Sequence, residues 1–195
     1  PFKALKEFKN HQYSTRFYDR NGNLLEIMAL EDGLRREWTP IEHIPEEVKT
    51  IFIEAEDSAF YKHHGIYLPA IFRAALQNAR NGRTVSGAST ITMQLARMVV
   101  PRSTPNATIK DKIKEAFIAF RIEAKLNKQQ ILELYLNNLP FGFRTEGVTS
   151  AAKNFYGVSI YELFKQIDEI AKKAGVPDDD DNRLMYGLLY VLRHE

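Results

Sequence analysis

Hydrophobic and polar positions alternate with helical spacing over most of the chain. Between residues 46 and 57 apolar side chains recur every three or four positions, and the run ends in the acidic pair Glu56-Asp57. This pattern predicts an amphipathic helix that starts just after Pro45, since proline suits the first helical position. Similar spacing predicts further helices from Pro69 to about Gly82, from about Ser89 to Val99, over 108–126 and from Asn127 to Asn138. The chain is therefore expected to be mainly helical.

The expected helix over 108–126 carries two apolar stripes. One stripe consists of Ile113, Phe117, Phe120 and Ala124, and the other of Ile118 and Ile122. At about 100° per residue the stripes lie on different sides of the helix, which predicts a central helix buried on both sides. Glu115 projects beside the second stripe and is a candidate for a buried carboxylate.

The segment before this helical region has a different pattern. Residues 13–30 predict two short strands around a turn at 19–23, where Asn21-Gly22 supplies positive φ. We therefore divide the chain into an N-terminal strand and linker region, 1–44, and a helical domain, 45–195. The two prolines in VVPRSTPNAT predict a mobile loop, and Asp178–Asp181 predicts a solvated linker.

Composition narrows the class of protein. A chain of 195 residues with 44% hydrophobic residues can bury a sizeable core. The absence of cysteine excludes disulfides and a thiol nucleophile. No apolar run approaches the roughly 18 residues of a membrane-spanning helix, and no signal peptide is present. Because the first residue is Pro1 rather than methionine, we expect that an upstream segment has been removed.

Charge is distributed unevenly along the chain. From Arg73 to Lys128 there are eleven lysine or arginine residues and three acidic residues, a local net charge of +8, although the whole chain has a net charge of only +2. Such a block suits nucleic acid, anionic lipid headgroups or a diphosphate. It lacks the interleaved aromatic residues that stack on single-stranded nucleic acid, so a helical nucleic-acid binder is the weakest alternative.

The candidate chemistry begins at Glu56 and Asp57. A carboxyl group held against an apolar wall can exchange a proton near neutral pH, although an acidic pair at a helix end is also typical of a solvated surface. The following His63-His64 pair has no third ligand at zinc spacing, so His63 is expected to orient a carboxylate or to cap the chain reversal. Glu133 is expected to be structural.

A second candidate lies at the start of the helix near Ser89. The fragment SGAST supplies a glycine, three hydroxyl groups and exposed backbone N–H groups, which together form an anion cradle. Gln94 and Arg97 follow further along the helix. The alternative is ordinary N-capping of the helix by Ser89.

Taken together, these fragments resemble the glycosyltransferase domain of class A penicillin-binding proteins, family 51 of the glycosyltransferases. The resemblance rests on four ordered segments over residues 13–177: EDSAFYKHHG, GASTITMQLAR, KIKEAFIAFRIE and KQQILELYLNNLPFGFRTEGVTSAAKNFYG. A fifth, EIAKKAGVP, keeps the family's spacing, and the sequence looks most like the 1C-type branch. Asp111 and Met98 depart from the family pattern, and from about residue 178 the chain is divergent or truncated.

The resemblance implies a lysozyme-like helical domain that polymerises lipid II into glycan strands with inversion and release of undecaprenyl diphosphate. Glu56 would be the general base and Glu115 would assist on the diphosphate side. The residues implied in binding the substrate and its diphosphate are Asp57, Phe60, His63, Arg73, Ser89, Thr90, Gln94, Arg97, Lys112 and Lys114. A divalent cation, Mg²⁺ or Mn²⁺, is a candidate cofactor.

The same resemblance implies a place on the outer, periplasmic face of the bacterial cytoplasmic membrane, normally through an N-terminal anchor absent here, and a fused or associated transpeptidase domain. Its partners would be lipid II and the growing glycan strand, with no nucleic acid. A membrane-facing patch is expected from Tyr67, Leu68, Ile71, Phe72, Met98, Val99 and Val100, flanked by Arg80, Arg83 and Arg102, unless the first four are core. Two other functions stay open: a lysozyme-like lytic hydrolase and a non-catalytic scaffold that binds lipid II or the cell wall.

Overall fold

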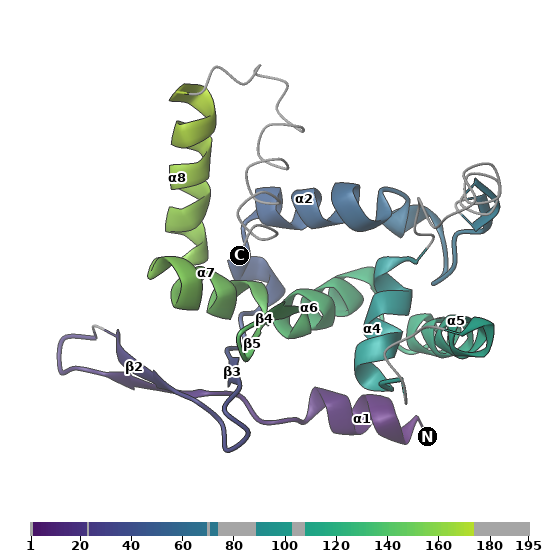
Figure 1. Cartoon of the computed structure of the whole chain (residues 1–195), viewed down its shortest axis with the longest axis horizontal. Helices are drawn as coiled ribbons and strands as arrows, with labels where there is room; N and C mark the ends of the chain where they lie inside the picture. The colour runs from purple at the N-terminus through teal and green to yellow at the C-terminus, as the bar shows by residue number, and fades with distance from the viewer. Residues whose placement is uncertain (1, 23, 70, 74–88, 103–107, 174–195) are drawn as a thin grey trace. The chain divides into compact units, whose positions relative to one another are not determined.

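The structure, a computed structural model, describes residues 2–22, 24–69, 71–73, 89–102 and 108–173 (Figure 1). Its helices are α1 (Lys3–Lys9), α2 (Glu46–Asp57), α4 (Ile91–Val99), α5 (Ile109–Glu123), α6 (Lys128–Asn138), α7 (Val148–Tyr156) and α8 (Ile160–Lys173), with 3₁₀ turns at Ile41–His43 and Phe60–Lys62. Its strands are β1 (Thr15–Tyr18), β2 (Leu24–Met28), β3 (Arg35–Arg36), β4 (Pro140–Gly142) and β5 (Thr145–Glu146). The expected fold class, mainly α with a short N-terminal hairpin, is confirmed.

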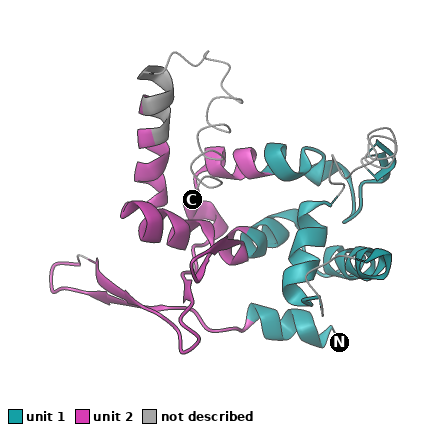
Figure 2. Ribbon diagram, in the orientation of Figure 1, with its two compact units in different colours: residues 1–9, 53–135 teal, residues 10–52, 136–195 magenta. Residues whose placement is uncertain are grey.

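The chain divides into two compact units, coloured separately in Figure 2. The first unit contains residues 1–9 and 53–135, and the second contains residues 10–52 and 136–195. This division cuts through α2 and α6, each of which begins in one unit and ends in the other. The domain boundary expected at residues 44 and 45 stays a prediction.

The second unit contains all the strands. β1 pairs with β2 in antiparallel register, with Thr15 opposite Met28, and β5 lies between β3 and β4 in a separate small sheet. Asn137 joins this unit together: its side-chain oxygen accepts from the Thr39 N–H at 2.7 Å and its amide donates to the Thr39 carbonyl at 2.8 Å. Gly147 has φ +86 and a Cβ there would lie 2.7 Å from the Asn137 carbonyl oxygen, so this close packing requires glycine.

The first unit is built around α4 and α5, which pack against each other, with α1 against α4. Leu95 and Ala96 of α4 and Ala119 and Ile122 of α5 are fully buried. Side chains cap the starts of two of these helices. Thr108 and Asp111 form a capping box at the start of α5, and Asn127 and Gln130 form a reciprocal pair of hydrogen bonds at the start of α6.

One prediction about α5 is wrong. The stripe containing Ile118 and Ile122 is buried, but Ile113, Phe117 and Phe120 are 59–65% exposed. Packing against α4 uses only one side of α5, so the stripe containing Ile113, Phe117 and Phe120 stays largely exposed. Within the patch expected to face a membrane, Leu68, Ile71 and Phe72 are exposed, whereas Val99 is 8% exposed and belongs to the core.

Several expectations fall outside the described residues. Residues 68, 69 and 71–73 are helical, as expected near Pro69, but the end of that helix near Gly82 is not described. The same holds for most of the expected loop after Pro101 and for the segment beyond residue 173. Within the part of the chain that is described, no helix is long and apolar enough to span a membrane.

Candidate active site

Glu56, near the end of α2, is one end of a chain of side-chain hydrogen bonds. Gln94, on α4, donates from Nε2 to Glu56 Oε2 at 2.8 Å, and its Oε1 accepts from the Tyr135 hydroxyl of α6 at 3.2 Å. Tyr135 is 1% exposed, whereas Glu56 remains partly accessible. The three side chains therefore form a line from the buried core to a carboxylate that solvent can reach.

The electrostatics of this line favour a protonated Tyr135. Burial raises the pKa of the Tyr135 phenol, the negative charges of Glu56 and Asp57 raise it further, and Arg97 opposes them. The hydroxyl is therefore a hydrogen-bond donor throughout the physiological pH range. Because the charge of Arg97 lowers the pKa of Tyr135, Arg97 lies close enough to this phenol to act on it electrostatically.

Asp57, the second acidic residue, points into the protein. Its carboxylate accepts from His63 Nε2 at 2.9 Å and from the Ile91 backbone N–H at 3.0 Å. His63 Nδ1 accepts from the Gly65 N–H at 3.1 Å, so the proton of the neutral ring is on Nε2, facing Asp57. The expectation that His63 orients a carboxylate and caps the chain reversal is confirmed on both counts.

The start of α4 is fastened to the same turn. Thr90, not Ser89, is the N-cap: its Oγ1 accepts from the Met93 N–H, and its hydroxyl donates to the Gly65 carbonyl at 2.6 Å. The expected cap by Ser89 is wrong, because the helix begins one residue later. Since Asp57 accepts from Ile91, a carboxylate of the protein itself occupies part of the positive end of the helix.

A third group of contacts, centred on Glu123 and Lys128, stabilises the turn after α2. Glu123 Oε1 accepts from the Thr92 hydroxyl at 2.7 Å and from Lys128 Nζ at 2.6 Å. The Lys128 ammonium also lies 4.4 Å from the centre of the Phe60 ring, a cation–π distance. These contacts hold the turn after α2 against α4, α5 and α6.

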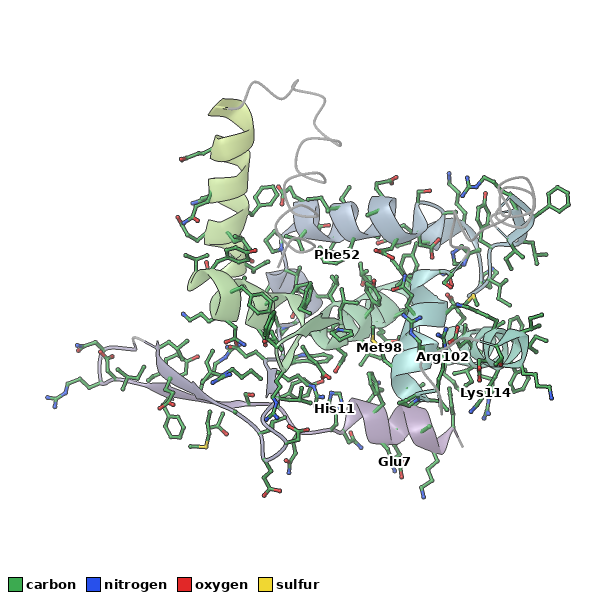
Figure 3. The ribbon with its side chains drawn as sticks, viewed as in Figure 1. Glu7, His11, Phe52, Met98, Arg102 and Lys114 are labelled. Atoms are coloured by element: carbon green, nitrogen blue, oxygen red, sulfur yellow. The ribbon has the colours of Figure 1, made fainter. Side chains whose placement is uncertain are left out.

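Glu115 is at the centre of a separate ionic cluster. It is 4% exposed and accepts from Arg102 Nε at 2.6 Å, and its other oxygen lies 3.2 Å from Lys112 Nζ. Lys112 also donates to Ser89 Oγ at 2.8 Å. Figure 3 labels Arg102 beside α5 and Lys114 on α5. The prediction of a buried carboxylate at Glu115 is confirmed, and two cations compensate its charge.

The residues expected to bind substrate differ in their burial and in their hydrogen-bond partners. Phe60 is fully buried and its ring packs against the Lys128 ammonium, so its part in substrate binding stays a prediction. The polar side-chain atoms of Asp57, His63 and Thr90 are engaged inside the turn. The structure brings Gln94 to Glu56 and Lys112 to Ser89.

The remaining two candidates lie apart from these contacts. Arg73 and Lys114 are exposed, and among the described residues no contact joins either to the Glu56 or Glu115 groups. Sequence reasoning assigned no role to Tyr135 and placed Arg102 at a membrane edge. An apolar helical face with one tyrosine gives no sign that its hydroxyl reaches a glutamine on another helix.

The described residues contain no group of three or more histidine, cysteine, aspartate or glutamate side chains that could hold a metal ion. One oxygen of Glu56 accepts from Gln94, Asp57 accepts from His63, and both oxygens of Glu115 face Arg102 or Lys112. The divalent cation therefore stays a prediction.

The described site thus combines one accessible, hydrogen-bonded glutamate with cations on the neighbouring helices. A family model described as Transglycosylase matches residues 21–182, and the chain belongs to that family. The match does not favour the lytic hydrolase or the non-catalytic scaffold.

Two relatives that the chain resembles share the name penicillin-binding protein 1A. The chain is 42% identical over 166 residues to penicillin-binding protein 1A of Escherichia coli and 40% identical over 177 residues to that of Aquifex aeolicus. These alignments cover 85% and 91% of the chain but only 19% and 23% of the relatives, so the chain spans about a fifth of their length. The finer likeness to the 1C-type branch stays a prediction.

Proposed function

We propose that this domain is a peptidoglycan glycosyltransferase that polymerises lipid II into glycan strands. The observation that carries the proposal is the Glu56 carboxylate, partly accessible and held at 2.8 Å by Gln94 in a chain of the transglycosylase family. An ionised carboxylate that accepts a fixed hydrogen bond is positioned to take a proton from a substrate hydroxyl.

In the proposed reaction Glu56 accepts the proton of the acceptor's sugar hydroxyl as its oxygen attacks the anomeric carbon of the lipid-linked donor. The new glycosidic C–O bond forms while the bond from that carbon to the diphosphate breaks, with inversion. The prenyl diphosphate leaves with the bonding electron pair. Negative charge therefore develops on the leaving group, and catalysis needs positive charge there.

The cations that could meet this charge lie on α4 and α5. Lys112 is 39% exposed and is steadied by Ser89 and Glu115, and Arg97 lies near the Glu56 line. Glu115 holds Lys112 and Arg102 in place, which supports the expected assistance on the diphosphate side through positioning. Arg73 and Lys114 stay candidates as exposed cations of the same unit.

The membrane is the proposed source of the substrate. On α5, Ile109, Ile113, Phe117 and Phe120 are 59–81% exposed and fall within about 80° of one another around the helix. The exposed Lys110, Lys114, Arg121 and Lys125 line one edge of this apolar stripe. An apolar helix face with a basic edge suits the surface of an anionic bilayer.

The proposal extends to the protein from which this domain comes. The chain spans only about a fifth of its relatives, which are named penicillin-binding proteins, and this supports a transpeptidase domain in the same polypeptide. A lipid-linked substrate and these relatives also support anchoring on the outer face of the bacterial cytoplasmic membrane.

Incubation with lipid II, followed by gel analysis of the products, tests the activity. The wild-type domain should make glycan strands, and Glu56→Gln should lower the rate by about 10²–10⁴ because the proton acceptor is lost. The matched control is Glu54→Gln, an exposed glutamate on the same helix, which should leave the rate unchanged. More than a tenth of the wild-type rate in Glu56→Gln would refute the assignment of the base.

Sedimentation with liposomes tests the membrane face. Phe117→Ser and Phe120→Ser should reduce binding to vesicles containing anionic lipid while preserving the fold, since both side chains are exposed. Tyr18→Ser, an exposed aromatic on the β1–β2 hairpin, is the control. Equal loss of binding in the control and in the α5 variants would contradict this face.

A further inference from the structure

The turn between β4 and β5 (Figure 1), in the second unit, has a strained backbone. Gly142 pairs with Thr145, which leaves Phe143 and Arg144 as a two-residue loop with φ of 42° and 56°. Such a loop needs positive φ at both positions and normally uses asparagine and glycine, because a larger side chain is crowded there. Within the described part of the chain, these are the two residues other than glycine that have positive φ.

Hydrogen bonds from the surrounding residues hold this turn in place. The Arg144 carbonyl accepts from the Arg35 N–H at 2.8 Å. The Thr145 hydroxyl donates to the Phe143 carbonyl at 3.4 Å, and its oxygen accepts from the Asn154 amide at 3.1 Å. A strained conformation persists where its surroundings over-determine it, and such strain is concentrated at sites that bind ligands.

The two strained residues present their side chains to solvent. Phe143 is 76% exposed, and its ring meets the ring of Phe155 in a T-shaped contact at 6.2 Å between centroids. Arg144 is exposed, and its guanidinium makes no hydrogen bond or ion pair with another described residue. This group lies over Gly33, where a Cβ would overlap its Nη1. The turn therefore displays an aromatic ring and, at the next residue, a cation that no described carboxylate neutralises.

The size of this surface favours a small ligand over a protein partner. A phenylalanine side chain has about 200 Å² of surface, so 76% exposure leaves about 150 Å² of Phe143 accessible. A stable protein interface buries about 800 Å² on each partner, several times more than this ring offers. A sugar ring matches the phenylalanine ring in size. Its C–H face packs on the aromatic ring while its hydroxyl groups stay in water, so no polar group is buried without a partner.

The cation selects among sugar ligands. A guanidinium without a counter-charge favours an anionic ligand, and its planar N–H donors match the geometry of a carboxylate. A peptidoglycan strand meets both requirements, because its repeating disaccharides carry short peptides that end in carboxylates. A neutral glycan would satisfy the aromatic ring alone.

We propose that the Phe143–Arg144 turn binds the growing glycan strand, with a sugar ring on Phe143 and a peptide carboxylate at Arg144. The proposal rests on the proposed function, whose product is such a strand. A polymer of many sugars extends beyond the two units that react, so a contact away from the reacting sugars holds the strand between successive transfers. The strained loop is explained in the same way: asparagine and glycine would relax the backbone but would remove both binding groups.

Soluble glycans test this site without a membrane and without turnover. Calorimetric titration compares chitotetraose, an uncharged tetrasaccharide, with a peptide-bearing tetrasaccharide from peptidoglycan. The wild-type domain should bind both, and at low salt it should bind the peptide-bearing one about fivefold more tightly, a difference that disappears at high salt. Arg144→Gln should remove this difference while it leaves the affinity for chitotetraose within about twofold.

Variants at Phe143 separate the ring from the turn. Phe143→Asn removes the ring and suits positive φ, so it should raise the urea midpoint of unfolding. It should weaken both glycans by about tenfold or more, since one sugar covers about 75 Å² of the ring. Phe143→Tyr keeps an aromatic ring and should bind both glycans like the wild type. Phe17→Ala removes an exposed phenylalanine from β1 of the same unit, and this control should leave both affinities unchanged.

The inference is overturned if the wild type binds neither glycan, if Phe143→Asn keeps the wild-type affinity for chitotetraose, or if Phe143→Tyr or Phe17→Ala weakens binding as much as Phe143→Asn does. Loss of liposome binding in Phe143→Asn with unchanged affinity for both glycans would assign the ring to the membrane instead. Failure of the proposed function is distinguishable, because it appears as absence of glycan strands from lipid II, whatever the affinity for these soluble glycans.

Discussion

Replacement of Tyr135 by phenylalanine tests how Glu56 is held. The hydroxyl of Tyr135 donates to Gln94 Oε1 at 3.2 Å, and this bond keeps the amide nitrogen of Gln94 directed at Glu56. Without the hydroxyl, the amide can turn and present its oxygen to the carboxylate, which weakens its hold on Glu56. Because Tyr135 is 1% exposed, the phenylalanine ring fills the same space and the substrate does not touch the change.

The magnitude follows from one neutral hydrogen bond, which is worth about 0.5–1.5 kcal/mol. If the whole of it is lost from the transition state, kcat for lipid II polymerisation should fall by about 2–13-fold. KM should change little, since Tyr135 is 1% exposed and is therefore out of reach of a bound substrate.

The decisive assay is a double-mutant cycle measured on kcat. In a Gln94→Ala background, Tyr135→Phe should change kcat by less than twofold, because the residue through which Tyr135 acts is absent. Tyr161→Phe is the control: it removes another tyrosine hydroxyl, which donates to the His43 carbonyl at 2.8 Å on the second unit. An equal loss of kcat from Tyr135→Phe in both backgrounds would refute the reasoning and assign Tyr135 to packing.

Three further changes probe stability, measured by urea unfolding. Gly65→Ala should lower the free energy of unfolding more than Gly22→Ala does. Both glycines have positive φ, which costs an alanine about 1–2 kcal/mol, but only a Cβ at Gly65 meets neighbours, at 3.1 Å. Equal losses from the two changes would contradict these contacts. Asp57→Asn should lower the free energy of unfolding by about 1–3 kcal/mol, because the charged acceptor for His63 and Ile91 is lost. A loss below about 0.5 kcal/mol would show that these two buried hydrogen bonds contribute little to stability. Burial, helped by Arg36, lowers the pKa of His11 from 6.5 to about 4, so the unfolded chain binds a proton that the folded chain does not as pH falls from 6.5 toward 4. The stability of the wild type should therefore fall from pH 7 to pH 5 by about 1 kcal/mol more than that of His11→Gln, after allowance for the half-exposed ring; parallel pH profiles would rule this out.

Local patterns were sufficient where the determinant lies within a few residues. The helix ending at Glu56-Asp57 and the Asn21-Gly22 turn both form as expected, because apolar spacing and positive φ are properties of adjacent residues. The family likeness was also a property of ordered residues alone, and the transglycosylase match confirms it.

Local patterns failed where two candidates are equivalent along the chain. Ser89 and Thr90 both suit an N-cap, and Thr90 takes the role because its hydroxyl also reaches the Gly65 carbonyl. Of the two apolar stripes on α5, only the one with Ile118 meets α4, and Phe117 is left exposed. Periodicity shows that a face is apolar but not which neighbour covers it.

The sequence by itself thus determined most of the helices, the family and the identity of Glu56 as the candidate base. Only the tertiary structure decided that Asp57 serves the turn through His63, that Gln94 and Tyr135 support Glu56, and that Lys112 donates to Ser89. The reason is physical. Secondary structure is selected by interactions among neighbours in the chain, whereas the partner of a buried carboxylate or hydroxyl comes from a distant helix, whose arrival depends on the packing of the whole core.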